Sequence, residues 1–360
     1  MKTLINILFI ATIALTSCKN QTEKSETAEN KPIQADPKGE FAKLNQFLRK
    51  FEEPSQTFKA PSDKQIKVVG KQGTIIRIDP VDLETEDGQP IGKEVDIELK
   101  ELSSQQQLLR ANAQTISDGQ LLVSGGAYFI QATSDGKKLK LKSGRTYSVE
   151  FPKLTNDSMS LYFGQRDSIG KMNWKKAEQN FESAQLKQNS SKEYNAVIVL
   201  GSGRKADTSI VAMKYMAKEE QKQFEHEIKI KEKVYKAMQL NQFGWVNCDK
   251  VFPNTPRTNL KFTITNNVEE VNYAAVYLVF KSVKSVWQSS YCVYDNKIEK
   301  EDFKNIPVGQ YVRLFSVCNQ HNKIFATLTD SILVNQNQTE NLILKEMNEA
   351  DFDRLIKSIN

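Results

Sequence analysis

The chain has 360 residues, of which 39% are hydrophobic and 26% are charged, and its formal net charge is +6. This length suffices for two domains of ordinary size, and the mean hydropathy of −0.53 excludes a protein made mainly of membrane-spanning segments. The weak positive charge is spread along the chain, which argues against nucleic-acid binding.

The first residues are typical of a bacterial export signal. Lys2 precedes the apolar run LINILFIATIAL, which is too short to span a bilayer. The run leads into LTSC at residues 15–18, which resembles the lipobox of bacterial lipoproteins. That resemblance implies removal of residues 1–17 and acylation of Cys18, with palmitate as a typical chain, which makes a durable anchor. Because Lys19 rather than Asp follows the cysteine, it also implies the outer membrane, on its periplasmic or its surface-exposed face.

Three further cysteines, Cys248, Cys292 and Cys318, lie among apolar residues. Export places them in a compartment where disulfides form, so at most one intramolecular disulfide among them is predicted. Buried thiols are the alternative. No Cys-x-x-Cys spacing occurs and the chain has only two histidines, so we predict neither a metal site nor a cofactor.

A polar tether is predicted for residues 18–40, because this segment lacks the aromatic residues needed to bury a core. From Phe41 to Phe51, apolar residues recur at three- and four-residue spacing. This spacing predicts a short amphipathic helix within residues 41–60. We expect that helix to pack on the first β-domain, with a peripheral membrane contact as the alternative.

The first β-domain is predicted for residues 61–175. Residues 95–99 and 147–151 alternate between apolar and polar side chains, which is the two-residue period of half-buried strands. Asp-Gly pairs predict tight turns, since both residues tolerate positive φ. These pairs lie at residues 87–88, 118–119 and 135–136.

Part of this domain resembles a known family. GTII at residues 73–76, IDP at 78–80 and GKEVDIE at 92–98 are similar to the ZU5 domain, a β-sandwich of receptors, scaffolds and bacterial surface proteins. The continuation at residues 117–141 is similar to an uncharacterised group of Gram-negative surface lipoproteins. The resemblance covers roughly residues 68–175, and its motifs imply a fold but no chemistry.

A linker region is predicted for residues 176–242. It begins with a polar stretch and continues with two strand-like runs, YNAVIVLG and DTSIVAM. Dense charge and an apolar stripe then predict a long charged helix over residues 213–241, with Gly244 as its stop. The stripe consists of Met213, Met216, Phe224, Ile228, Tyr235 and Met238.

Short strand-like runs at residues 243–346 predict a second β-sandwich. A short C-terminal helix is predicted within residues 347–360, with Asn348 as its N-cap. The predicted fold class is therefore mainly β. Two β-sandwich domains are joined by a long charged helix, and short helices lie near both termini.

Lys138, Lys140 and Lys142 alternate with leucines, so the three lysines are expected on one face of a strand. One interpretation is a lysine-guarded edge strand that resists further pairing. The other is a contact for an anionic ligand such as lipopolysaccharide or a glycan.

No arrangement of residues in the sequence predicts catalysis, so we expect the protein not to be an enzyme. The expected function is a lipid-anchored cell-envelope lipoprotein that acts as a non-catalytic binding or structural module for protein or glycan partners. One alternative is an envelope hydrolase acting on peptidoglycan or polysaccharide. Another is an accessory subunit of a surface secretion or motility machine that docks through the charged helix.

Overall fold

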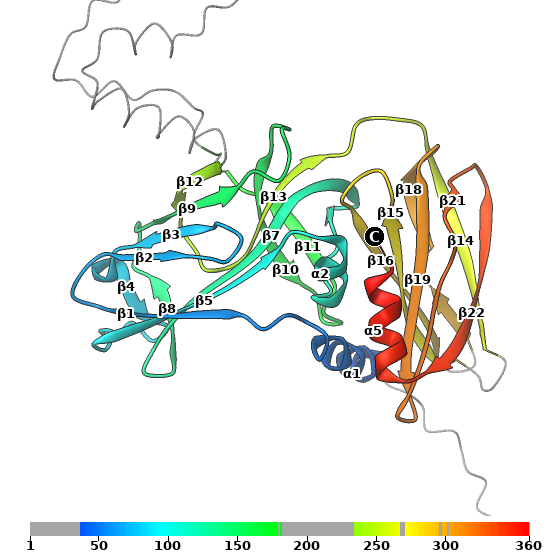
Figure 1. Cartoon of the computed structure of the whole chain (residues 1–360), viewed down its shortest axis with the longest axis horizontal. Coiled ribbons are helices and arrows are strands. Elements are labelled where there is room, and N and C mark those ends of the chain that lie inside the picture. Colours follow the sequence, from blue (N-terminus) through cyan, green and yellow to red (C-terminus); the bar gives the residue numbers. More distant parts are fainter. Residues whose placement is uncertain are drawn as a thin grey trace, which may run out of the picture. The chain divides into compact units, whose positions relative to one another are not determined.

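A computed structural model describes residues 37–178, 181, 234–266, 271–294, 297–300 and 302–359, which all belong to one compact unit (Figure 1). The described chain is mainly β. The predicted signal peptide, the tether up to residue 36 and the two strand-like runs of the linker lie outside the described residues.

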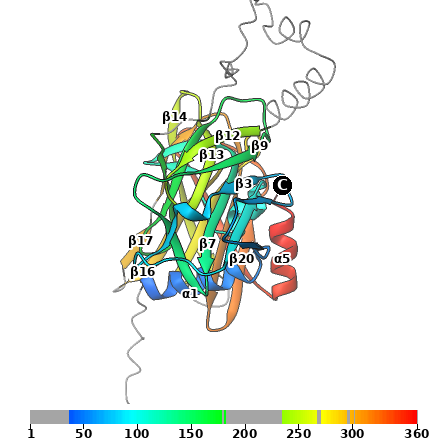
Figure 2. The ribbon, with the colours of Figure 1, turned by 90° about the vertical axis from the view of Figure 1, so that its left-hand side faces the viewer.

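Two sheets form the N-terminal sandwich (Figures 1 and 2). The first contains β1 (Gln56–Pro61), β4 (Leu83–Thr85), β5 (Glu94–Leu102), β6 (Ile116–Ser117), β7 (Gln120–Ser134), β8 (Lys137–Leu141), β10 (Ser160–Arg166), β11 (Met172–Lys176) and β13 (Gly244–Val251). The second contains β2 (Ile66–Val69), β3 (Ile75–Ile78), β9 (Tyr147–Pro152) and β12 (Val234–Leu240). A 3-10 turn at Pro80–Asp82 precedes β4. Apolar side chains of both sheets, such as Ile97 and Val149, share one core.

The predicted alternation is confirmed in β5, where Val95, Ile97 and Leu99 are fully buried. Their neighbours along the strand are only half-buried, as expected for a sheet with one face toward the core. Asp118 and Asp135 have φ angles of 47° and 50°, and each is followed by a glycine with positive φ. These two Asp-Gly turns connect β6 to β7 and β7 to β8, as predicted.

Nine strands form the C-terminal sheet. They are β14 (Arg257–Asn266), β15 (Tyr273–Phe280), β16 (Val286–Tyr294), β17 (Lys297–Lys300), β18 (Phe303–Pro307), β19 (Tyr311–Gln320), β20 (Lys323–Leu328), β21 (Ile332–Leu333) and β22 (Gln338–Met347). The sheet curls so that strands far apart in its order approach each other: Lys300 on β17 donates to the carbonyl of Phe262 on β14 at 2.6 Å.

The predicted long helix is wrong over its last part. Residues 234–240 form β12, which pairs with β9 so that Tyr235 lies opposite Phe151. A shift of register between Ala237 and Leu240 breaks the two-residue period and produces a three-residue apolar spacing that resembles a helix. Residues 213–233 lie outside the described residues, and Gly244 begins β13 instead of ending a helix.

The predicted boundary at residue 243 is also wrong. β13 lies between β7 and β10 in the first sheet, with Trp245 opposite Phe129 and Cys248 opposite Leu161. The predicted second sandwich is a single hydrogen-bonded sheet that starts at Arg257. Strand-like composition reveals a strand but does not reveal its partner, so these long-range pairings were not predictable from local patterns.

Three helices are present in the described part of the chain: α1 (Pro37–Arg49), α2 (Gln105–Arg110) and α5 (Glu349–Lys357). α1 ends earlier than predicted, and β1 occupies the end of the predicted helical range. We expected α1 to pack on the first β-domain, and the structure adds a contact with the C-terminal sheet, where the ring of Phe41 lies 6.1 Å from that of Tyr273 on β15. Asn45 also donates to the carbonyl of Ile169 at 2.7 Å, so α1 contacts both regions.

α5 confirms the predicted C-terminal helix and its cap. The Asn348 side chain accepts from the Asp351 N–H at 2.9 Å, which satisfies one otherwise unpaired helix donor. The fully buried Phe352 packs against the rings of Phe47, Phe51 and Phe315. The two helices therefore share a small aromatic cluster over the C-terminal sheet.

Residues 105–117, which we call the junction, connect the N-terminal sandwich directly to the C-terminal sheet. The amide of Gln105 donates to three carbonyls of the β15–β16 connection, at 2.6 Å to Phe280, 3.1 Å to Val283 and 3.0 Å to Ser285. Ser104 caps α2 through a reciprocal capping box with Gln107, which fixes the helix start. One side chain of the junction thus satisfies three carbonyls of the neighbouring region.

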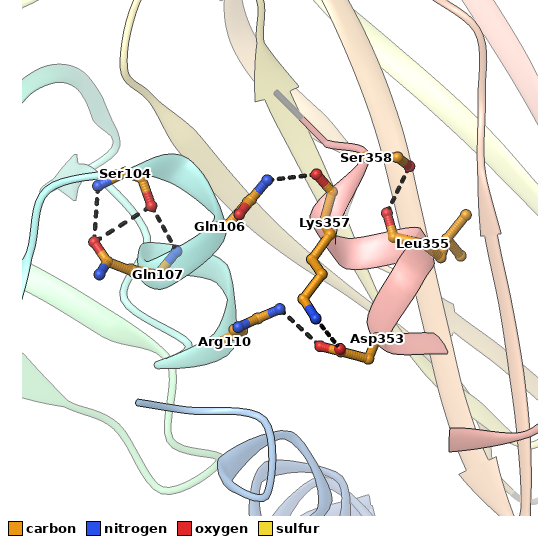
Figure 3. A network of polar contacts seen from close by, with 8 residues as sticks. All are labelled: Ser104, Gln106, Gln107, Arg110, Asp353, Leu355, Lys357 and Ser358. Carbon is orange, nitrogen blue, oxygen red and sulfur yellow. Dashed lines mark hydrogen bonds and ion pairs between the residues drawn. The ribbon is translucent and has the colours of Figure 1, made fainter. Parts of the chain in front are cut away.

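The junction continues as extended backbone along β16. Thr115 donates its N–H to Val286 at 2.7 Å, and the amide oxygen of Gln114 accepts from the Gln288 N–H at 2.9 Å. On the other side of α2, Arg110 forms an ion pair with Asp353 of α5 at 2.8 Å (Figure 3). Direct hydrogen bonds and ion pairs therefore join the two regions.

Candidate functional site

The three lysines predicted from the sequence lie on β8 and just after it. β8 pairs with β7 on one side, with Lys138 opposite Thr133, and with the short strand β4 on the other, with Lys140 opposite Glu84. A strand paired on both sides is not a sheet edge, so the interpretation of a lysine-guarded edge is wrong. This pairing does not test the second interpretation, a contact with an anionic ligand.

Acidic residues compensate this basic strand. Lys140 pairs with Glu84 at 3.4 Å, and Arg145 after the strand pairs with Asp82 at 3.3 Å. The Lys142 ammonium donates to the carbonyl of Val81 at 2.7 Å. An anion would therefore compete with these partners, which lowers the affinity expected of the predicted anionic site.

A hollow of about 380 Å³ opens beside the end of β8. It is lined by residues 141–146 together with Gln239 and Asn241 from the end of β12 and the residue after it. Gly144 has a φ of 72°, so a glycine suits the turn that shapes the hollow. Lys142 and Arg145 both line it, but each already has a partner at Val81 or Asp82.

The three cysteines are all buried, and within the described residues they form no disulfide. Cys292 on β16 and Cys318 on β19 lie on either side of β15. Two strand spacings separate them by about 9.5 Å. A disulfide needs Cα atoms within about 7 Å. Cys248 belongs to a different sheet, where burial raises its thiol pKa well above the usual value. The structure therefore contains buried thiols, which were the predicted alternative to a disulfide.

A buried polar cluster that the sequence analysis missed lies where β7 passes β13. Asn247 pairs with Ala127 but Asp249 pairs with Ser124, so Gly125 and Gly126 together face Cys248. This is a β-bulge. The φ of Gly126 is 125°, which only glycine adopts readily, and a Cβ at Gly125 would lie 2.6 Å from a carbonyl oxygen. The Ser-Gly-Gly sequence inside a strand-like run was the available signal.

The bulge brings three polar side chains together. Asn247 donates to Asp249 Oδ2 at 2.6 Å, and Ser124 Oγ lies 3.4 Å from the amide oxygen of Asn247. Asp249 is completely buried, and desolvation raises its pKa well above the usual value. Its carboxyl is therefore held in the protonated form to higher pH than an exposed aspartate.

Lys284, on the β15–β16 connection, brings the C-terminal sheet to this cluster. Its carbonyl accepts the Ser124 N–H at 2.9 Å. Desolvation lowers the pKa of its ammonium, and the charge of Asp249 acts in the opposite direction. Ser124, Asn247 and Asp249 line neither the hollow beside β8 nor the second hollow, which is described next. We therefore assign the cluster a structural role at the contact between the two regions.

A second hollow, of about 260 Å³, lies on the C-terminal sheet where β14, β18 and β22 meet. Its lining is almost wholly polar and consists of Arg257, Thr258, Asn259, Asn305, Gln336 and Asn337. Sequence analysis did not single out any of these residues, because a single arginine at the start of a strand forms no recognisable pattern.

The anchor cysteine and the two histidines of the chain remain to be placed. Cys18 and His226 lie outside the described residues, and His321 lies in the turn between β19 and β20. The described ranges contain no group of three or more potential metal-ligating His, Cys, Asp or Glu side chains. Among those same ranges, no helix combines the length and apolarity needed to cross a membrane.

The described residues form a mainly β structure with a directly bonded junction, and polar hollows lie beside β8 and at the start of β14. Comparison of the chain with protein-family models, with curated proteins and with solved structures finds no match in any of the three. Function is therefore inferred from the residues of this chain.

Proposed function

We propose that the protein is a lipid-anchored lipoprotein of the outer membrane whose body is a non-catalytic binding or structural module for protein or glycan partners. The observation that carries the proposal is the apolar run ending in LTSC at residues 15–18. A small residue before the cysteine suits the cleavage, and the thiol of Cys18 accepts the lipid.

The hydrolase alternative would need a pair of carboxylates at a glycan-binding site. The two hollows described above are lined by no carboxylate or histidine, so neither of them is proposed as such a site. The accessory-subunit alternative depended on a charged helix over residues 213–241. Residues 234–240 of that range form β12, an edge strand paired with β9, so this part of the range is not the helix that the alternative invoked.

Membrane fractionation of the full chain tests the anchor. We expect Cys18→Ala to move the protein from the membrane pellet to the soluble fraction or to leave an uncleaved precursor. The matched control is Ser17→Ala, which keeps a small residue at the cleavage position and should remain in the membrane. Unchanged pelleting of the Cys18→Ala variant, with normal processing, would contradict the proposal.

A further inference from the structure

Arg257 is held beside the second hollow by two carbonyl groups and an aromatic ring. Its two terminal nitrogens donate to the carbonyls of Asn305 at 3.2 Å and Pro253 at 3.1 Å. Its guanidinium stacks over the Phe252 ring with a centroid distance of 5.5 Å. Among the described residues, no ion pair involves this arginine. Partial burial lowers its pKa.

The guanidinium retains donors for a ligand. Arginine carries five N–H donors in a planar fork, and the two carbonyls use two of them. Because the stacking and the carbonyls already fix the side chain, little rotamer entropy remains to be lost on binding. A planar, preorganised fork without a counterion suits a carboxylate or a similar oxyanion.

The rest of the lining suits hydroxyl groups. Asn259, Asn305, Gln336 and Asn337 present amides, each of which offers both donors and acceptors, and hydroxyl groups of a sugar also do both. Asn305 and Asn337 both have φ angles of 56°. Asn305 lies in β18 where its register with β14 shifts, and Asn337 lies in the turn before β22, so both amides are presented at the rim by left-handed residues. The volume of about 260 Å³ lies just below the roughly 300–1,000 Å³ of sites for drug-sized ligands, which suits a single sugar unit of a longer chain.

We infer that this hollow binds an acidic saccharide, with a carboxylate on the Arg257 fork and ring hydroxyls on the surrounding amides. The inference rests on the proposed function, since it names the ligand class of a glycan-binding envelope module. The hollow beside β8 is the natural comparison, because it also contains an arginine. There, Asp82 already pairs with Arg145 at 3.3 Å, so an acidic ligand gains less.

Calorimetric titration of the mature full chain, purified in detergent, tests the site. The probes are an oligogalacturonate as the acidic saccharide, maltohexaose as a neutral saccharide and inorganic phosphate as a simple anion. We expect the oligogalacturonate to bind, and Arg257→Gln to raise its Kd about tenfold or more, the loss expected for a charged hydrogen-bonded pair. Arg145→Gln removes the same charge from the other hollow and should change the Kd less than about twofold.

A second variant covers the case in which Arg257→Gln impairs folding. Asn337→Asp keeps the size and the tolerance of positive φ but adds a negative charge at the rim, so it should also weaken the acidic saccharide. Absence of oligogalacturonate binding, equal binding by the variants and wild type, or equally tight phosphate binding would each overturn the inference. These outcomes leave the fractionation result for Cys18→Ala unaffected, so a failure of the site is distinguishable from a failure of the anchor.

Discussion

β5 of the N-terminal sandwich and β15 of the C-terminal sheet are buried in different ways. β5 alternates between buried and half-exposed residues, whereas all eight residues of β15 are buried. On one face of β15, Tyr273 contacts α1 and the hydroxyl of Tyr277 donates to Asn112 of the junction at 2.9 Å. β15 is therefore covered by elements from other parts of the chain. We infer that the C-terminal sheet unfolds together with the N-terminal sandwich.

The largest expected effect comes from removing the aromatic cluster over the C-terminal sheet. Phe352→Ala deletes a fully buried ring that lies 5.1 Å from Phe47 and 6.0 Å from Phe315. Such a change costs about 3–5 kcal/mol of unfolding free energy. Urea denaturation of the full chain, followed by circular dichroism and tryptophan fluorescence, measures this loss. Two separated transitions in the wild type would break the inferred coupling.

A smaller effect is expected at the buried contact between the regions. The raised pKa of Asp249 means that the folded protein retains a proton that the unfolded chain releases above its ordinary value of 3.8. Stability attributable to this group therefore falls as the pH rises above that value. Asp249→Asn should remove this slope. The free energy of unfolding of the variant, relative to that of the wild type, should therefore be greater at pH 7 than at pH 4.

The control for this pH dependence is an aspartate of opposite behaviour. The Lys250 side chain, with help from Thr155, lowers the pKa of the half-buried Asp157. Asp157 therefore contributes stability that is lost as the pH falls, so Asp157→Asn should change the slope in the opposite direction. Melting temperatures measured from pH 4 to pH 8 compare the variants. Identical slopes for wild type and Asp249→Asn would show that the buried carboxyl does not titrate as its burial requires.

The smallest effect is expected at the surface contact between α1 and α5. Lys50 and Glu349 form an ion pair at 3.0 Å, and each side chain is 59% exposed. Lys50→Gln should cost less than about 1 kcal/mol, and this cost should shrink further at high salt. Urea denaturation at low and high salt measures it. A loss as large as that of Phe352→Ala would show that charge, rather than apolar packing, holds these helices together.

The sequence predicted elements whose signal is local. β5 and α5 were found because alternation and an N-cap are read from neighbouring residues, as with Asn348. β12 was mistaken for helix because its register shift altered the apolar spacing. The place of β13 depends on β7 and β10, both of which are distant in the sequence. The basic strand was predicted, but its ion pair with Glu84 was not. Arg257 was identified as a candidate only from its contacts in the structure.

Hydrogen–deuterium exchange of the full chain tests the coupling of the two regions most directly. The amides of β5 report on the N-terminal sandwich and those of β15 on the C-terminal sheet. Coupled unfolding predicts that Phe352→Ala accelerates the exchange of both strands by a similar factor. Faster exchange in β15 with wild-type protection in β5 would contradict the account.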